Sequence, residues 1–281
     1  MGAIAQWWEN RTTWQRVLLI LALLWVVASV IFVLTRGPAP EAGVYRIPVG
    51  GGDPTFVTEG NDPAWSPDGT SILVTSDDDG GTSGIYVAEI GGSEATFVTN
   101  GDNPSWAPDG SSVVFAGEDA EGNISIYTIA LAGGEATFLT DGDEPAWSPD
   151  GTSIAFSGEG ESGTRGVYLF DLESNEVTFV TDGDEPAWSP DGSTIAFVGE
   201  NADGGTDIYT IALEGSEVAF VTGGDDPTWS PDGTIIALTG ASDVGSAIYT
   251  VTPGSEAVMV TPGQNPTWSA DGSELAFVTT E

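Results

Sequence analysis

Residues 143–151 read DEPAWSPDG, and the chain of 281 residues contains six copies of this phrase with small changes. The other copies are NDPAWSPDG from residue 61, DNPSWAPDG from 102, DEPAWSPDG from 184, DDPTWSPDG from 225 and QNPTWSADG from 264. Their tryptophans follow one another at intervals of 41, 41, 41, 41 and 39 residues. This period is typical of four-stranded β-propeller blades and is longer than the roughly 34 residues of helical-hairpin repeats.

Three further patterns run in step with the tryptophans and indicate three more strands in each repeat. Apolar residues stand three and five positions after each turn glycine, as Ile154 and Phe156 do, which predicts a strand with one buried face. All six tyrosines recur in register, and a run such as Thr-Phe-Val-Thr follows each of them. Threonine and valine favour extended backbone. We name the four predicted strands A (Pro-x-Trp), B (Ile-x-Phe), C (Ile-Tyr) and D (Thr-Phe-Val-Thr).

The two ends of the repeat region complement each other. Residues 43–58 contain only C and D, whereas residues 266–279 contain only A and B. Pairing these ends closes the ring and removes exposed sheet edges. The sequence therefore predicts an all-β, six-bladed propeller of four-stranded blades, whose last blade takes C and D from the N-terminal side and A and B from the C-terminus.

The Ser-Pro-Asp-Gly stretch has a local explanation. Serine, proline, aspartate and glycine in this order suit a type I turn that joins A to B. We therefore interpret the aspartates of this stretch as turn residues: Asp68, Asp109, Asp150, Asp191, Asp232 and Asp271. The tryptophans are interpreted as packing between neighbouring blades, because large aromatic side chains dominate such contacts.

These repeats resemble the WD-repeat-like tandem motif of TolB-type propellers, in which W-S-P-D-G, a following I-A-F, an I-Y and a terminal L-T recur in each blade. The resemblance covers residues 43–281 and implies the six-bladed fold. For the TolB family proper it also implies a separate N-terminal α/β domain and a soluble periplasmic protein. In this chain we expect a membrane anchor in the place of that domain.

The expected anchor is the uncharged run VLLILALLWVVASVIFVL at residues 17–34, which Arg16 and Arg36 bound. At 1.5 Å per residue it is about 27 Å long, so with its flanks it can cross a hydrocarbon core of about 30 Å. A cleaved signal peptide is the alternative, but its apolar core usually has only about 7 to 15 residues. We expect an uncleaved transmembrane α-helix.

Arg11 and Arg16 precede the run and only Arg36 closely follows it, which favours a cytoplasmic N-terminus. The predicted organisation is a cytoplasmic or interfacial segment at 1–16, a single transmembrane helix at 17–35, a linker at 36–43 and a propeller at 44–281. We expect the protein in the cell membrane, with its propeller on the periplasmic or extracellular side.

Composition excludes much of enzyme chemistry. The chain has 43 acidic residues, five arginines and no lysine, histidine or cysteine, and its formal net charge is −38. Such a surface repels nucleic acid and anionic lipid. Without these residue types there is no Ser-His-Asp triad, thiol nucleophile or Schiff-base lysine. Carboxylate chemistry remains, as in glycosidases, but no acid pair stands out, so we predict no catalytic residue and no definite cofactor.

The two residues before each proline of the phrase are expected to ring the mouth of the central channel, because strand A lines it. All twelve carry side-chain oxygen, and Ca²⁺ takes six to eight oxygen ligands. This pattern predicts a candidate calcium ring of eight carboxylates: Asp62, Asp102, Asp143, Glu144, Asp184, Glu185, Asp225 and Asp226. The alternative is turn chemistry, since Asp and Asn also bond to nearby backbone N–H groups.

Two function classes follow. The first is a non-enzymatic interaction or scaffold subunit of an integral membrane complex, whose propeller docks on extracytoplasmic parts while the helix packs in the bilayer. The second is a module that binds or hydrolyses carbohydrate or peptidoglycan with its acidic face. We favour the first, because an even ring of acids suits docking better than catalysis.

Overall fold

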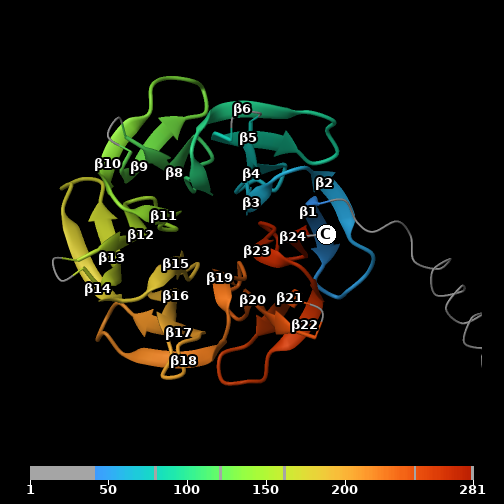
Figure 1. The fold of residues 1–281 in the computed structure, drawn as a ribbon, viewed down its shortest axis with the longest axis vertical. Helices are drawn as coiled ribbons and strands as arrows, with labels where there is room; N and C mark the ends of the chain where they lie inside the picture. The colour runs from blue at the N-terminus through green and yellow to red at the C-terminus, as the bar shows by residue number, and fades with distance from the viewer. Residues whose placement is uncertain (1–41, 79–80, 120–121, 161–162, 244, 280–281) are drawn as a thin grey trace, which may run out of the picture. The chain divides into compact units, whose positions relative to one another are not determined.

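The computed structural model describes residues 42–78, 81–119, 122–160, 163–243 and 245–279. They form 24 strands in six four-stranded antiparallel sheets, which stand around a central axis (Figure 1). The predicted transmembrane helix at 17–35 and the N-terminal segment before it lie outside the described residues. Among the residues that are described, no helix has the length and apolarity that a bilayer crossing requires.

Each blade uses its strands in the predicted order A, B, C and D from the axis outwards. Blade 1 contains β3 (Asn61–Trp65), β4 (Ser71–Asp77), β5 (Ser83–Glu89) and β6 (Ala95–Asn100). Blade 2 contains β7 (Asp102–Trp106), β8 (Ser112–Glu118), β9 (Ile124–Ala130) and β10 (Thr137–Asp141). Blade 3 contains β11 (Asp143–Trp147), β12 (Ser153–Glu159), β13 (Arg165–Asp171) and β14 (Val177–Asp182).

The remaining blades follow the same plan. Blade 4 contains β15 (Asp184–Trp188), β16 (Thr194–Glu200), β17 (Thr206–Ala212) and β18 (Val218–Gly223). Blade 5 contains β19 (Asp225–Trp229), β20 (Ile236–Ser242), β21 (Gly245–Val251) and β22 (Val258–Pro262). Blade 6 contains β23 (Gln264–Trp268), β24 (Glu274–Thr279), β1 (Gly43–Pro48) and β2 (Thr55–Thr58).

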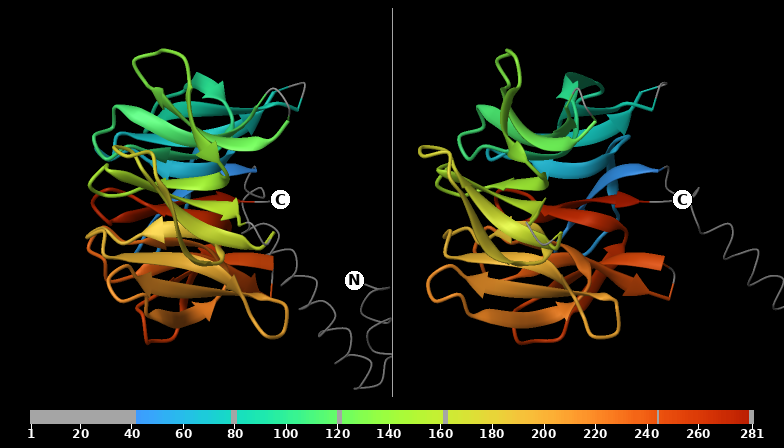
Figure 2. Two further views of the ribbon diagram at one scale, coloured as in Figure 1. Left: turned by 90° about the vertical axis from the view of Figure 1, so that its left-hand side faces the viewer. Right: turned by 60° about the vertical axis from the view of Figure 1, so that its left-hand side comes forward.

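Blade 6 confirms the predicted closure by both ends of the repeat region. β1 pairs with β24 antiparallel, from Gly43 opposite Thr279 to Pro48 opposite Glu274. Figure 2 shows these two strands side by side. An ion pair reinforces the junction, because Arg46 Nη1 lies 2.9 Å from Glu274 Oε2. The ring is therefore held shut by strand pairing between segments far apart in the sequence.

The B strands differ from the prediction, because both of their faces are buried. In β12, Ile154 and Phe156 are 0% and 2% exposed, but Ala155 between them is also 0% exposed. Each blade is covered on both sides by a neighbour, so the alternation of buried and exposed positions is lost. Buried clusters join adjacent blades, and one of them, with Val44, Ile72 and Val278, spans the junction of blades 6 and 1.

The turn residues and tryptophans behave as predicted. Gly69 N donates to Ser66 O at 2.9 Å, and Asp68 Oδ1 accepts from Ser66 Oγ at 2.7 Å, so the aspartate shapes the A-to-B turn. Trp106 bridges two blades, because its indole N–H donates to Ala64 O of blade 1 at 2.9 Å. Both features serve the fold.

Candidate functional site

A β-bulge in each strand A directs one side chain towards the axis. In β11, Asp143 pairs with Ser157 and Ala146 pairs with Ala155, so Glu144 and Pro145 together oppose Phe156. A bulge of this kind changes the direction of a side chain. The six bulged residues have φ angles between 44° and 53°, in the left-handed region that few residues other than glycine adopt: Asp62, Asn103, Glu144, Glu185, Asp226 and Asn265.

These bulged residues and the prolines after them line a cavity of about 210 Å³ at the axis. Four of the eight proposed calcium ligands line the cavity, namely Asp62, Glu144, Glu185 and Asp226. The other four occupy the first position of their strand, outside the set that lines it: Asp102, Asp143, Asp184 and Asp225. The bulge separates the two sets, because it directs only the second residue of each pair inwards.

Hydrogen bonds connect the bulged residues of successive blades. Glu144 Oε2 accepts from Ser157 Oγ at 2.9 Å and from the backbone N–H of Glu185 at 3.2 Å. Glu185 Oε2 in turn accepts from the N–H of Asp226 at 2.7 Å. Asn265 Nδ2 donates to Asp62 Oδ1 at 2.8 Å across the junction of blades 6 and 1. These side chains therefore join the blades at the axis.

Burial changes the acidity of these carboxyl groups. Burial, a hydrogen bond donated to Asp184 and repulsion from neighbouring carboxylates raise the pKa of Glu144 to about 8. Burial and repulsion from Asp226 raise the pKa of Glu185 to about 7. Burial likewise raises the pKa values of Asp62 and Asp226. Burial at the axis therefore favours the protonated, uncharged form of these carboxyl groups.

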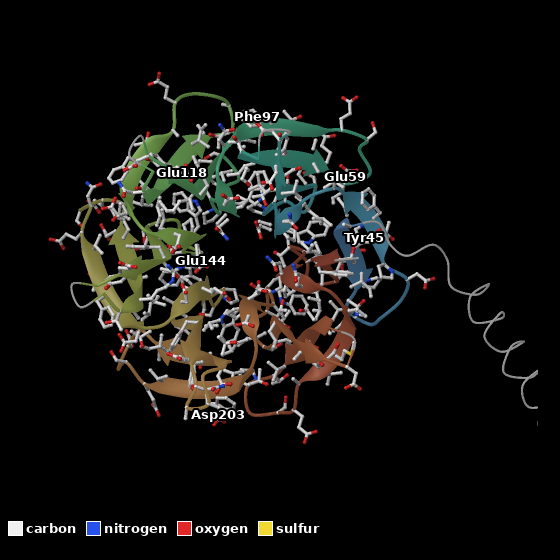
Figure 3. All side chains as sticks on the ribbon, in the orientation of Figure 1. Tyr45, Glu59, Phe97, Glu118, Glu144 and Asp203 are labelled. Atoms are coloured by element: carbon white, nitrogen blue, oxygen red, sulfur yellow. The ribbon has the colours of Figure 1, made fainter. Side chains whose placement is uncertain are left out.

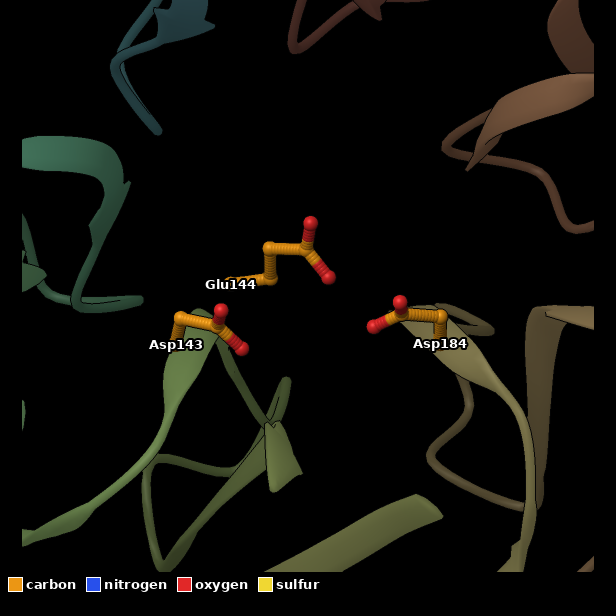
Figure 4. A group of neighbouring side chains, drawn as sticks. All are labelled: Asp143, Glu144 and Asp184. Atoms are coloured by element: carbon orange, nitrogen blue, oxygen red, sulfur yellow. The ribbon is translucent and has the colours of Figure 1, made fainter. Parts of the chain in front are cut away.

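Arg165 occupies the junction of blades 3 and 4, where Asp143, Glu144 and Asp184 converge (Figure 4). Oxygen atoms of these three carboxyl groups lie within 4.8 Å of one another, a spacing that could hold a metal ion. The guanidinium already bonds to all three: Nη2 lies 2.7 Å from Asp143 Oδ1 and 3.3 Å from Glu144 Oε2, and Nε bonds to Asp184.

The guanidinium also affects the acidity of this cluster. Although burial opposes the shift, hydrogen bonds from Glu144 and Arg165 lower the pKa of Asp184. An arginine thus supplies the positive charge at this cluster. Calcium binding at the axis stays a prediction for the four carboxylates that line the cavity.

The described residues form grooves between neighbouring blades, on the face that carries the B-to-C loops and the D-to-A connections. The grooves between blades 1 and 2, 2 and 3, and 3 and 4 have volumes of about 770, 690 and 520 Å³. Each is lined by a B-strand phenylalanine stacked on a C-strand tyrosine, with centroids 5.6 to 5.9 Å apart: Phe115 and Tyr127, Phe156 and Tyr168, Phe197 and Tyr209. Acidic residues such as Glu118 line the same grooves (Figure 3).

Sequence reasoning missed Arg165 and the serine and threonine partners of the ring. The signal for Arg165 was available, because it is the sole arginine among six equivalent positions, three residues before each tyrosine. The partners Thr75, Ser157 and Thr239 also recur, in alternate blades. Only an alignment of the repeats against one another would have revealed either feature.

Comparisons with known proteins agree with this architecture. A family model described as the TolB beta propeller domain matches residues 54–185 and 144–281. No curated protein sequence matches the chain. The structure is similar to that of a putative TolB from Agrobacterium tumefaciens, with a TM-score of 0.75 and 23% identity over 85% of this chain and 98% of that one.

Two further solved structures share the fold. TolB from Acinetobacter baumannii has a TM-score of 0.65 and 19% identity, over 85% of this chain and 63% of that chain. An oligogalacturonate lyase in complex with manganese has a TM-score of 0.54 and 14% identity, over 86% and 92% of the two chains. At these identities the structures are evidence for the fold alone. The family match extends over most of the sequence, and the chain belongs to the TolB β-propeller family.

Proposed function

We propose that this protein is a membrane-anchored, non-enzymatic interaction subunit of an integral membrane complex, with its propeller on the extracytoplasmic side. Within the propeller, the observation that carries the proposal is a difference between the axial carboxyl groups, which hold the blades together, and the side chains that line the grooves. The axial carboxyl groups bond to neighbouring blades. The grooves, by contrast, are lined by partly exposed tyrosines, each stacked on a buried phenylalanine, and by carboxylates, and such surfaces suit recognition of another protein.

The anchor rests on the sequence. The apolar run at 17–34 and the arginines before it support a single span with a cytoplasmic N-terminus. Chain entry at β1 supports a propeller close to the bilayer, because residues 37–43 of the linker extend over at most about 25 Å. Docking on the extracytoplasmic part of a membrane complex is the simplest use of this arrangement.

Purification of the full-length chain in mild detergent tests the proposal. We expect integral membrane proteins to co-migrate with it in a fixed ratio through two chromatographic steps. The same preparation with residues 17–35 replaced by an unrelated single-pass helix separates the contributions of helix and propeller. A wild-type chain that migrates alone, at the mass of one chain in its micelle, contradicts the proposal.

A second candidate, binding or hydrolysis of carbohydrate or peptidoglycan, is favoured by one observation. The pKa of Glu144 is raised and that of Asp184 is lowered, which are the opposite shifts of an acid and a base in glycosidases. The two carboxyl groups of this pair hydrogen-bond to each other, however, whereas those of a glycosidase lie at least about 5 Å apart. Against it, Arg165 bonds to both members. Release of soluble fragments from purified peptidoglycan, abolished by Glu144→Gln, would favour this alternative.

A further inference from the structure

The groove between blades 1 and 2 is the largest of the three and differs in charge from the other two. Acidic residues Asp102, Glu118, Asp119 and Asp143 line it, and no arginine or lysine does so among the described residues. Arg165 lines both of the other grooves. The chain therefore supplies its own cation to two grooves and leaves the first one acidic.

Internal repetition shows how a cation fits such a groove. In blade 3, Arg165 pairs with Glu159 at the start of strand C, and its carbonyl accepts from Gly183 N at 3.3 Å. In blade 2, Ile124 pairs with Glu118, and its carbonyl accepts from Gly142 N at 3.4 Å. The two backbones are thus equivalent. Ile124 stands where blade 3 has its arginine, and its side chain is 46% exposed.

The acidic partners are equivalent as well. Arg165 bonds to Asp143 and Asp184, the first residues of strand A in blades 3 and 4. The corresponding residues around Ile124 are Asp102 and Asp143, the first residues of strand A in blades 2 and 3, and both line the first groove. Asp102 also accepts a hydrogen bond from Ser83, and Asp143 one from Arg165. Acceptors for a second guanidinium are therefore already positioned.

We propose that the groove between blades 1 and 2 binds an arginine side chain of a partner protein. The guanidinium bonds to Asp102 and Asp143, as that of Arg165 does one blade further on. The aliphatic stem lies against Tyr127, a partly exposed ring that lines the groove and stacks on the buried Phe115. Charge complementarity and aromatic contact both favour arginine here. This inference rests on the proposed function and names the chemistry by which the partner is recognised.

Fluorescence anisotropy with the full-length protein in detergent tests the site. The probes are a fluorescein-labelled Gly-Ser-Arg-Ser-Gly peptide and its citrulline counterpart, which keeps the shape of arginine but not its charge. Because a guanidinium bonded to carboxylates contributes more than about 1.4 kcal/mol, we expect the citrulline peptide to bind at least about tenfold more weakly.

The matched variants are Ile124→Arg and Val258→Arg. Both add one positive charge at an exposed aliphatic residue, but Val258 belongs to β22 of blade 5, far along the ring. Ile124→Arg places the chain's own guanidinium in the groove, so the arginine peptide should bind about tenfold more weakly, whereas Val258→Arg should change its affinity less than about twofold. Equal effects of the two variants, or equal binding of the two peptides, overturn the proposal.

Failure of the groove assignment is distinguishable from failure of the proposed function. If membrane subunits co-purify with wild type and equally with Ile124→Arg, the groove assignment is wrong and the proposed function stands. If no membrane subunit co-purifies with wild type, the proposed function is wrong, and the peptide measurements alone decide whether the groove binds arginine. Melting curves of both variants verify that they are folded.

Discussion

At the scale of single residues, the blade tryptophans are not equivalent. Trp106, Trp188 and Trp268 donate an indole hydrogen bond to the preceding blade. Buried indole N–H groups without a hydrogen-bond partner belong to Trp65, Trp147 and Trp229. The two sets occupy alternate blades, so the sixfold repeat is in detail a threefold repeat of blade pairs.

This difference predicts that replacement of tryptophan by phenylalanine reduces the free energy of unfolding by different amounts in the two sets. Trp106→Phe removes the hydrogen bond from the indole to Ala64 O, whereas Trp147→Phe removes an N–H group that has no acceptor. Both variants lose similar packing, so Trp106→Phe should reduce the free energy of unfolding by about 1 kcal/mol more. Urea unfolding of the two variants measures this difference. Equal losses would show that the hydrogen bond of Trp106 contributes nothing.

The axial carboxyl groups predict how stability changes above pH 5. The pKa of Glu144 is about 8 in the folded chain against an ordinary value of 4.5. Its stabilising contribution is therefore complete below about pH 4.5 and is lost as the pH rises through 8. Glu185, with a pKa of about 7, acts in the same direction.

Melting temperature should consequently fall between pH 5 and pH 8. Glu144→Gln mimics the protonated form and should flatten this fall, because glutamine does not titrate. An unchanged slope above pH 5 in Glu144→Gln would refute the assignment of this pH dependence to Glu144.

The turn aspartates predict a separate loss of stability in acid. The pKa values of Asp191 and Asp271 are lowered to about 2, so their contribution to stability is lost as the pH falls from about 4 towards 2.

Calcium gives a separate prediction for the same carboxylates. If Asp62, Glu144, Glu185 and Asp226 hold Ca²⁺ in the axial cavity, calcium should raise the melting temperature relative to excess chelator. By mass action the free energy of unfolding rises by about 2.7 kcal/mol at a calcium concentration of about 100 times Kd and by about 4.1 kcal/mol at about 1,000 times Kd. Asp226→Asn should reduce the shift. Identical transitions in calcium and chelator would remove the predicted site.

At the scale of elements, the connection from D to A contains a glycine shortly before the bulge. Gly142 has a φ of 141°, and a Cβ there would lie 2.6 Å from Phe156 Cδ2 and 2.7 Å from Ser157 O. The glycine lets the chain pass the neighbouring strand B immediately before the bulge. Its place in the repeat is therefore a structural requirement of strand A.

Gly142→Ala tests this requirement. We expect a loss of roughly 2 to 4 kcal/mol in the free energy of unfolding, because both the backbone conformation and the close contacts oppose a side chain. Gly50→Ala is the matched control, since a methyl group added at Gly50 would have nothing within 4 Å and the φ of this residue is not positive. Chemical denaturation compares the two, and equal stability of both variants would contradict the prediction.

The elements also show what the sequence could and could not reveal. The regular spacing of the tryptophans and tyrosines equivalent to Trp147 and Tyr168 predicts the strands, because each of these aromatic residues occupies the same place in its blade. Alternation along a strand cannot predict the bulge, which places Glu144 at the axis and Asp143 outside it. Alignment of the repeats shows Arg165 as the one arginine among six equivalent positions, but its role could not be predicted, because it depends on contacts between blades.

At the scale of the whole molecule, the antiparallel order of the strands gives the propeller two unlike faces. The B-to-C loops and D-to-A connections form one face, with the acidic grooves, and the A-to-B and C-to-D turns form the other. The chain contains no cysteine, so a single introduced cysteine can be labelled with a cross-linker at one known position. The central claim is that the grooved face contacts a membrane protein.

Site-specific cross-linking in intact membranes tests that claim most directly. The variants are Ile124→Cys on the grooved face and Glu173→Cys in the C-to-D turn of blade 3, both labelled with a benzophenone maleimide. We predict an adduct with an integral membrane protein from position 124 and none from position 173. Adducts from position 173 alone, or from neither position, would contradict the account.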